Sequence, residues 1–239
     1  LKSTLGEKRS LFFNDKLRLK STLTITGSEV ASKIDTFNLQ NLETPFLKAG
    51  EKSSEMKYSF SSTLKKKINV RNDIDLGIYY DIIDYSYHDS TYRHQLYEHD
   101  TDIKGRMSFF RAFGQYQHKF SDNVLMVAGI NYQWLLLNNT DAVEPRVGFK
   151  WDLNGVQSLN IGFGMHSQMQ PRMVYFAQSQ LTDGSYALSN KNLDFSRSRH
   201  FVLGHDYQLK ENLRLKSEIY YQQLYDIPVK EMLSSYSML

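Results

Sequence analysis

The sequence contains no cysteine, no long apolar run and no marked excess of charge of one sign. Its longest uninterrupted apolar stretch covers residues 124–130, whereas a helix that spans a membrane needs about 20 residues. A transmembrane helix is therefore excluded. The net charge of +3, with positive and negative residues interspersed, gives no argument for a nucleic-acid partner. The lack of cysteine excludes a disulfide framework but decides little about the compartment.

What the chain does contain is a regular alternation of apolar and polar residues. Residues 124–136 place one face that is apolar throughout, ending in Tyr132 and Trp134, against a second face that turns polar at Asn131 and Gln133. Side chains of a β-strand point to opposite faces with a period of two. Similar segments recur along the chain. One apolar and one polar face is the pattern of a membrane-spanning β-barrel, in which lipid-facing and lumen-facing residues alternate.

The overall composition is compatible with such a barrel. Mean hydropathy is −0.50, as in an ordinary soluble protein, but this average is misleading where each lipid-facing residue is followed by a polar one. Aromatic residues make up 13% of the chain, as expected where rings mark the two membrane–water boundaries.

Predicted turns differ in length between the two ends of the strands. Short turns are predicted at residues 13–16, 65–67, 121–122, 153–155 and 210–212. Long connections are predicted at 27–55, 84–102 and 169–199, and a tight one near 139–143. Short turns at one rim and long loops at the other are typical of outer-membrane barrels.

Charged residues are predicted to avoid the apolar face, because a Lys or Arg that faces hydrocarbon at mid-bilayer costs about 2–4 kcal/mol. Arg146, Lys150, Arg214 and Lys216 all fall on the opposite face of their strands. Such charged inner faces favour a wide lumen, either wet or plugged by protein, over the packed interior of a small barrel. Glu144 and Arg146 are expected to form a structural ion pair in this lumen. We therefore predict an all-β fold, an antiparallel up-and-down transmembrane β-barrel that is partial, with about ten strands of a larger barrel.

Three stretches carry a resemblance to a known family. They are residues 143–151 (VEPRVGFKW), residues 161–168 (IGFGMHSQ) followed by Gln170 and Pro171, and residues 215–229 (LKSEIYYQQLYDIPV). They resemble the mid-barrel of TonB-dependent receptors of the Bacteroidetes type, the SusC-like relatives with a carboxypeptidase-regulatory-like domain. The likeness runs from about residue 109 to the end of the sequence.

This resemblance implies a receptor in the cell outer membrane, surrounded by outer-membrane lipid, that takes up a scarce nutrient cargo. It implies energy passed from a TonB complex through a plug domain. Residues 1–239 are then one segment of a single barrel domain, and the plug and terminal strands are not in this chain. The resemblance identifies neither the cargo nor whether a surface lipoprotein caps the receptor.

Candidate cargo-contacting residues lie in two predicted external loops. The first loop contributes Tyr92, Arg93, His94, Tyr97 and His99, and the second contributes Arg172, Tyr175 and Tyr186. Arginine suits carboxylate groups on a cargo, and binding residues concentrate on loops. The plain alternative is a solvated loop rich in turn formers. No pair of ligating residues has a recognised zinc spacing, so no metal site is predicted.

No cofactor-binding motif and no catalytic set is recognisable. His166 and Ser167 are neighbours on a strand and point to opposite faces, so they cannot form a nucleophile–base pair. Two alternatives to a transporter stay open, an outer-membrane barrel hydrolase and a soluble all-β binding domain.

Overall fold

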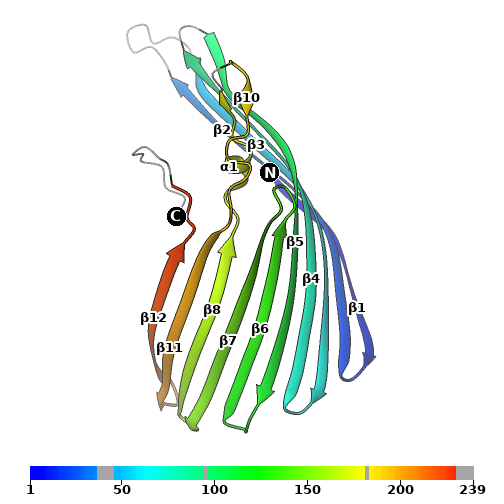
Figure 1. The fold of residues 1–239 in the computed structure, drawn as a ribbon, viewed down its shortest axis with the longest axis vertical. Coiled ribbons are helices and arrows are strands. Elements are labelled where there is room, and N and C mark those ends of the chain that lie inside the picture. The colour runs from blue at the N-terminus through cyan, green and yellow to red at the C-terminus, as the bar shows by residue number, and fades with distance from the viewer. Residues whose placement is uncertain (37–45, 94–95, 181–182, 230–239) are drawn as a thin grey trace.

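The computed structural model describes residues 1–36, 46–93, 96–180 and 183–229. Ten strands form one antiparallel sheet in which each strand pairs with its neighbours in the chain (Figure 1). The sheet order is β1 (Lys2–Asn14), β2 (Leu17–Thr36), β3 (Phe46–Asn69), β4 (Asn72–Arg93), β5 (Leu96–Lys119), β6 (Val124–Leu135), β7 (Thr140–Asn154), β8 (Gln157–Gln168), β11 (Ser196–Lys210) and β12 (Leu213–Tyr225). The prediction of about ten up-and-down strands is confirmed.

One connection carries further elements. Between β8 and β11 lie a short helix α1 (Arg172–Tyr175) and a two-stranded hairpin, β9 (Ser179–Gln180) with β10 (Tyr186–Ala187). No helix among the described residues is long and apolar enough to cross a membrane.

Four of the five short turns lie where the sequence predicts them, at one end of the sheet. The turn predicted at residues 65–67 is wrong. The three lysines continue β3, with Lys65 opposite Asp75, and the chain reverses only at Val70 and Arg71. A run of like charges resembles a solvated turn, but here the backbone ladder between β3 and β4 continues through Lys67, and Lys65 Nζ also pairs with Asp75 Oδ2 at 2.9 Å.

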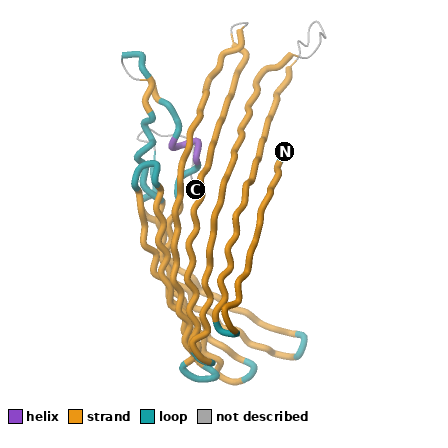
Figure 2. Tube along the Cα trace, turned by 90° about the vertical axis from the view of Figure 1, so that its right-hand side faces the viewer, coloured by secondary structure: helices purple, strands orange, loops and turns teal. Residues whose placement is uncertain are grey.

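Two of the three long connections are also wrong. Most of the segments predicted as loops at 27–55 and 84–102 are strand, because β2 runs to Thr36 and β3 starts at Phe46, while β4 and β5 are joined at residues 94–95. These upper halves form a projection beyond the short strands β6 to β12 (Figures 1 and 2). They lack a regular apolar face, so the alternation that marks a half-buried strand is absent from the sequence.

The pairing register divides the side chains between two faces. The apolar residues of the alternating pattern all lie on one face of the sheet. On each strand they occupy a segment of about nine residues, which is the length that a tilted strand needs to cross a bilayer. The segments are residues 17–25, 56–64, 74–82, 108–116, 124–134, 143–151, 159–165, 201–207 and 213–221. Within them, no Lys, Arg, Asp or Glu lies on the apolar face.

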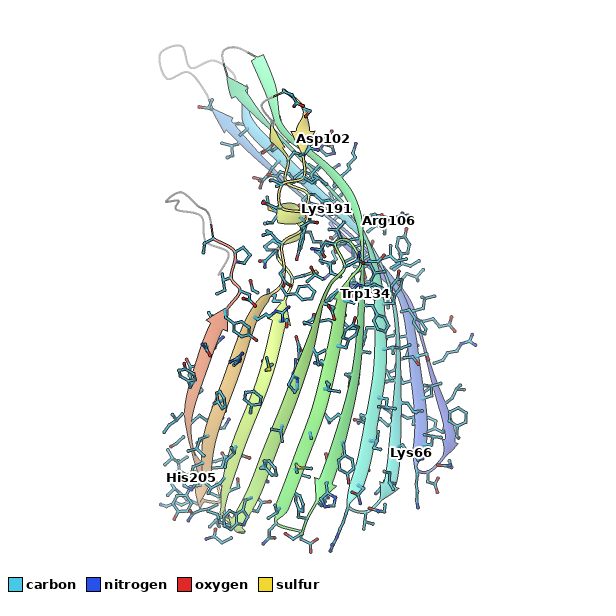
Figure 3. All side chains as sticks on the ribbon, in the orientation of Figure 1. Lys66, Asp102, Arg106, Trp134, Lys191 and His205 are labelled. Atoms are coloured by element: carbon cyan, nitrogen blue, oxygen red, sulfur yellow. The ribbon has the colours of Figure 1, made fainter. Side chains whose placement is uncertain are left out.

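The ends of this apolar band are marked by polar groups (Figure 3). At the upper end Arg106 and Asp84 pair in two hydrogen bonds of 2.5 and 2.9 Å, one step beyond the band on β5 and β4. Toward the lower end His205 lies among Leu203 and Tyr207, as its position in the sequence predicts, and bonds Gln157 at 3.2 Å. Strand β1 is an exception, since its Glu7 and Arg9 lie on the apolar face and pair with each other.

The hydrophobic core lies on the opposite, polar face. Here the β8–β11 connection lies over the sheet (Figure 1). Its aromatic residues pack against apolar side chains of β4, β5, β6 and β7. The core residues are Ile83, Ile103, Met107, Phe109, Leu135, Ala142, Tyr175, Phe176 and Phe195. We call the connection, residues 169–195, the roof segment.

Candidate functional site

A pocket of about 400 Å³ opens on the polar face next to the core. Its wall is built by β4 to β8, which the register brings level at this height. Its lining side chains include two arginines, two amides, a carboxylate and a histidine, namely Arg111, Arg146, Asn131, Gln133, Glu144 and His166, with Tyr79 and Phe113. We call this the wall pocket.

Glu144 is the centre of the polar network in this pocket. Its side chain is almost completely buried and accepts hydrogen bonds from four groups. Oε1 accepts from the Gln133 amide and from the Ser167 backbone N–H at 2.6 Å, and Oε2 accepts from Asn131 at 3.3 Å and Arg146 at 2.7 Å. The ion pair predicted between Glu144 and Arg146 is confirmed. A buried carboxylate is tolerated because every lone pair is occupied.

The position of Glu144 explains why a carboxylate is needed there. The β7–β8 ladder ends at the pair Arg146 and Gly164, above which the two strands separate. Ser167 on β8 therefore loses its backbone partner on β7. The Glu144 carboxylate accepts its N–H, and the Gln133 amide donates to its carbonyl at 2.9 Å. The two side chains replace the missing backbone bonds.

Asp81 forms a second buried centre at the pocket's edge. Only 4% of the residue is exposed, and its Oδ2 pairs with Lys57 Nζ and Arg111 Nη2, both at 3.1 Å. The Arg111 guanidinium also lies over the rings of Tyr79 and Phe109, at 5.2 and 5.3 Å from their centroids. These contacts fix the arginine with its Nε buried and without a hydrogen-bond partner.

A histidine pair extends the polar face toward β11. The rings of His166 and His200 meet edge to face, with centroids 4.7 Å apart. Ser198 bonds the Nε2 atom of His200 at 2.9 Å. This is a serine–histidine contact, but no acid is bonded to His200 among the described residues, so the third member of a hydrolytic triad is missing.

The roof segment is held over the wall by burial and by the ion pair between Arg172 and Glu55. Tyr175 and Phe195 have no exposed surface, and Phe176 packs directly on Gly105 of β5, where an added Cβ would lie 2.3 Å from the ring. Burial raises the pKa of the Tyr175 phenol, whose oxygen accepts the Gln170 N–H at 3.1 Å. Arg172 Nη1 pairs with Glu55 of β3 at 2.5 Å.

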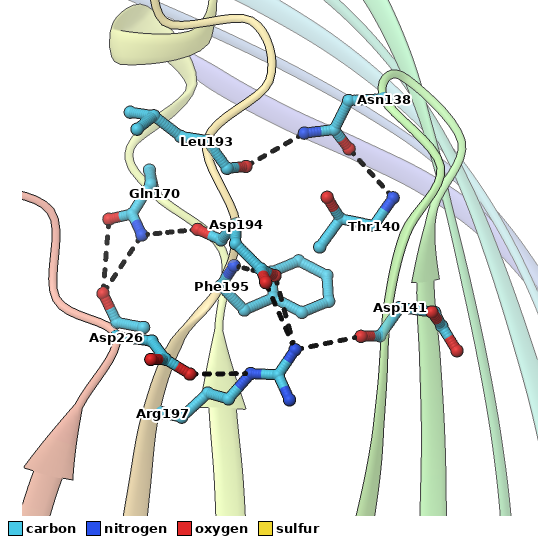
Figure 4. Close-up of polar contacts among 10 residues, drawn as sticks. Asn138, Thr140, Asp141, Gln170, Leu193, Asp194, Phe195, Arg197 and Asp226 are labelled. Atoms are coloured by element: carbon cyan, nitrogen blue, oxygen red, sulfur yellow. Dashed lines mark hydrogen bonds and ion pairs between the residues drawn. The ribbon is translucent and has the colours of Figure 1, made fainter.

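The end of the roof segment is tied to its surroundings through Arg197 (Figure 4). The guanidinium contacts the Asp194 carboxylate, the Asp141 carbonyl and the Asp226 carboxylate at 3.4 to 3.6 Å. Asn138 of the β6–β7 turn donates to the Leu193 carbonyl at 2.9 Å. The roof segment, the β6–β7 turn and the chain after β12 are thus joined at one point.

The predicted cargo-contacting residues lie in two separate places. Tyr92 and Arg93 end β4, and Tyr97 and His99 begin β5, at the tip of the projection; His94 lies outside the described residues. The interpretation of this stretch as a loop is wrong, since it is a strand hairpin. Tyr186 belongs to β10 of the roof segment, while Tyr175 is buried and Arg172 is ion-paired in this structure.

The wall pocket was not predicted as a site. Arg111 lies in the middle of an ordinary strand pattern, and its partners Asp81 and Tyr79 come from β4, about 30 residues earlier in the sequence. The only signal was the inward-facing Glu144 and Arg146. No group of three or more potential metal ligands occurs in the described part of the chain.

Comparison with known proteins supports the architecture but not a close relative. No family model and no curated protein matches the sequence. Among solved structures, the chain is similar to the copper transporter OprC, with a TM-score of 0.71 and 12% identity over 93% of this chain and 39% of that one. It is similar to the RagAB peptide importer, with a TM-score of 0.61 and 14% identity over 96% and 31%.

A third similar structure is the siderophore receptor PirA from Acinetobacter baumannii, with a TM-score of 0.62 and 12% identity over 93% of this chain and 34% of that one. The chain therefore spans less than two fifths of the length of each of these structures. All three are transporters or receptors by name. At such low identity the likeness concerns the fold alone: the ten antiparallel up-and-down strands match part of a larger antiparallel up-and-down barrel.

Proposed function

We propose that the chain is a wall segment of an outer-membrane receptor that imports a nutrient in a TonB-dependent manner. The observation that carries the proposal is the separation of the two faces. From β2 to β12, the band of about nine residues per strand has no charged residue on the apolar face, while ion pairs such as Glu144–Arg146 are held on the other. This arrangement suits a barrel with lipid outside and a polar lumen within.

The roof segment and the wall pocket then belong to the lumen. A cargo captured above the membrane would meet the roof segment first and the wall pocket beneath it. The plug domain, which this chain does not contain, would complete the path and receive energy from the TonB complex. Tyr92, Arg93, Tyr97 and His99 at the tip of the projection, with Tyr186 in the roof segment, are proposed as the first contacts for cargo. His94, which lies outside the described residues, is proposed with them. Arg172 and Tyr175 would join them only after the roof segment moves.

The sequence resemblance favours the Bacteroidetes type of receptor. Under that proposal the projection formed by β2 to β5 offers a surface for a lipoprotein cap. The similarity in fold to the RagAB peptide importer does not decide the cargo.

The test is growth of a strain that lacks the gene, across single carbon, nitrogen, iron and copper sources. The proposal expects a growth defect on one limiting nutrient, an equal defect when TonB is removed, and rescue by the complete gene. Uptake that continues unchanged without TonB would contradict it. Turnover of a lipid or peptide substrate by the purified full-length protein would favour the hydrolase alternative.

A further inference from the structure

The wall pocket has more hydrogen-bond donors than acceptors left for a ligand. Both oxygens of Glu144 are occupied by protein donors, and Asp81 is occupied by Lys57 and Arg111. By contrast, Arg111 and Arg146 each give one amino group to a carboxylate, and the buried Nε of Arg111 has no partner. The side chains of both arginines are more than two fifths exposed, on the pocket side.

The charges in and beside the pocket leave a small positive excess. Lys57, Arg111 and Arg146 carry three positive charges, and Asp81 and Glu144 carry two negative ones. A partly enclosed pocket strengthens such an excess relative to open water. One surplus charge matches a singly charged anion better than a doubly charged one.

The pocket also contains an aromatic surface. Tyr79 and Phe113 stack with their centroids 6.1 Å apart, and both line the pocket beside Arg111. The Arg111 guanidinium carbon lies 5.2 Å from the centroid of the Tyr79 ring, and its Nη2 donates to Asp81, so these two contacts limit the positions that the guanidinium can take. A planar guanidinium edge binds the two oxygens of a carboxylate in a bidentate geometry.

We infer that the wall pocket binds a monocarboxylate group through Arg111 and Arg146, with its attached apolar part against Tyr79 and Phe113. This inference rests on the proposed function, because it places the group in the lumen. The carboxylate can come from the imported cargo or from an acidic side chain of another segment of the complete protein. Both sources present the same chemistry to the two arginines.

The first arm of the test uses the complete protein purified in detergent and titrated calorimetrically with benzoate, benzamide and inorganic phosphate. Benzoate should bind, and the neutral isostere benzamide and the more highly charged phosphate should bind at least about tenfold more weakly. Arg111→Gln and Arg146→Gln should each weaken benzoate binding by about 10- to 100-fold, since a hydrogen bond to a charged group is lost. Both variants should fold, because Asp81 keeps Lys57 and Glu144 keeps three donors.

The matched control is Arg214→Gln. Arg214 also lies on the polar face and pairs with an aspartate, Asp206, at 2.7 Å, but near the short-turn end and away from the pocket. Its loss should leave benzoate binding unchanged. An equal loss of benzoate affinity in all three variants would overturn the inference. It would show that the total charge of the lumen, and not the wall pocket, determines benzoate binding.

The second arm separates the two sources. In R111K and R146K, a carbodiimide joins the introduced amine to any carboxylate that occupies the pocket, and mass spectrometry identifies it. A cross-link to a carboxylate other than the wall residues Asp81 and Glu144 assigns the pocket to an internal partner. Benzoate binding without such a cross-link assigns it to cargo. If benzoate does not bind and no cross-link forms, the inference is refuted. TonB-dependent growth on the nutrient would be unaffected by that result, so failure of the inference and failure of the proposed function are distinguishable.

Discussion

Glu144 and Ser167 are joined by a hydrogen bond of 2.6 Å across the point where β7 and β8 separate, so a carboxylate takes the place of a strand carbonyl. This bond links the wall of the sheet to the start of the roof segment, two residues further along the chain. It makes the stability of the sheet and the position of the roof segment depend on one buried side chain.

Glu144→Ala should destabilise the protein by about 3 kcal/mol, because it removes the shared acceptor of the Ser167 N–H and of the buried Gln133 amide. The measurement is the free energy of unfolding from urea titration of the complete protein in vesicles. The control is Glu218→Ala, since Glu218 is about half exposed and pairs with Lys216 on the same face. It should cost less than about 1 kcal/mol. Equal costs would contradict the role given to Glu144.

Ile130→Lys should hinder membrane insertion. Ile130 lies in the middle of the apolar band and is 53% exposed, so a lysine there would face hydrocarbon at a cost of about 2–4 kcal/mol. Gln115→Lys on β5 adds the same charge on the polar face, at a residue that is also exposed, and should cost little. The yield of folded protein in vesicles, read from heat-modifiable migration in electrophoresis, distinguishes them. Similar yields would argue against a lipid-facing band.

Phe195→Ala should loosen the roof segment. Phe195 has no exposed surface and meets Phe109 edge to face at 6.3 Å, so its truncation should cost about 3 kcal/mol or more. If the truncation lowers the free energy of local opening of the roof segment by this amount, trypsin should cut after the exposed Lys191 about 100-fold faster. Leu188→Ala, which changes a 38% exposed residue of the same segment, should leave the cleavage rate nearly unchanged. A rate for Phe195→Ala that matches this control would show that the aromatic contact does not hold the segment.

The roof segment should also loosen at high pH. Burial raises the pKa of Tyr175 above its ordinary value near 10, so the folded state favours the neutral phenol. The unfolded tyrosine loses its proton first, and the stabilisation is therefore complete below pH 10 and decreases as the pH rises toward the folded-state pKa. Trypsin cleavage at Lys191 should accelerate above pH 10 after correction for protease activity. Tyr175→Phe should remove this part of the pH dependence, and an identical profile in both proteins would refute the assignment.

The sequence predicted the sheet well where one face is apolar. From β5 to β12 the strict alternation, as in Val147, Phe149 and Trp151 against Lys150 and Asp152, defined strands, faces and turns within a few residues. The upper halves of β2 to β5 were missed because no apolar face exists there to give a period of two. The roof segment was missed for another reason. Phe195, for example, contacts Phe109, which lies 195 − 109 = 86 residues earlier in the chain, and local patterns carry no information on such contacts.

The positions of the register shifts in the long strands β2 to β5 determine how a force would be transmitted along these strands. In β2 to β5 every break in pairing register lies at a tip or beside a turn: between Ile34 and Asp35, between Lys67 and Asn69, and between Asp89 and Thr91. Above the break beside the turn, the β3–β4 ladder is unbroken as far as the pair Ser53 and Tyr87. No shift in register therefore occurs where β3 and β4 extend from the apolar band into the projection. We therefore expect the projection to be rigidly continuous with the lower halves of β2 to β5. A force applied at its tip would tilt these lower halves together instead of separating them.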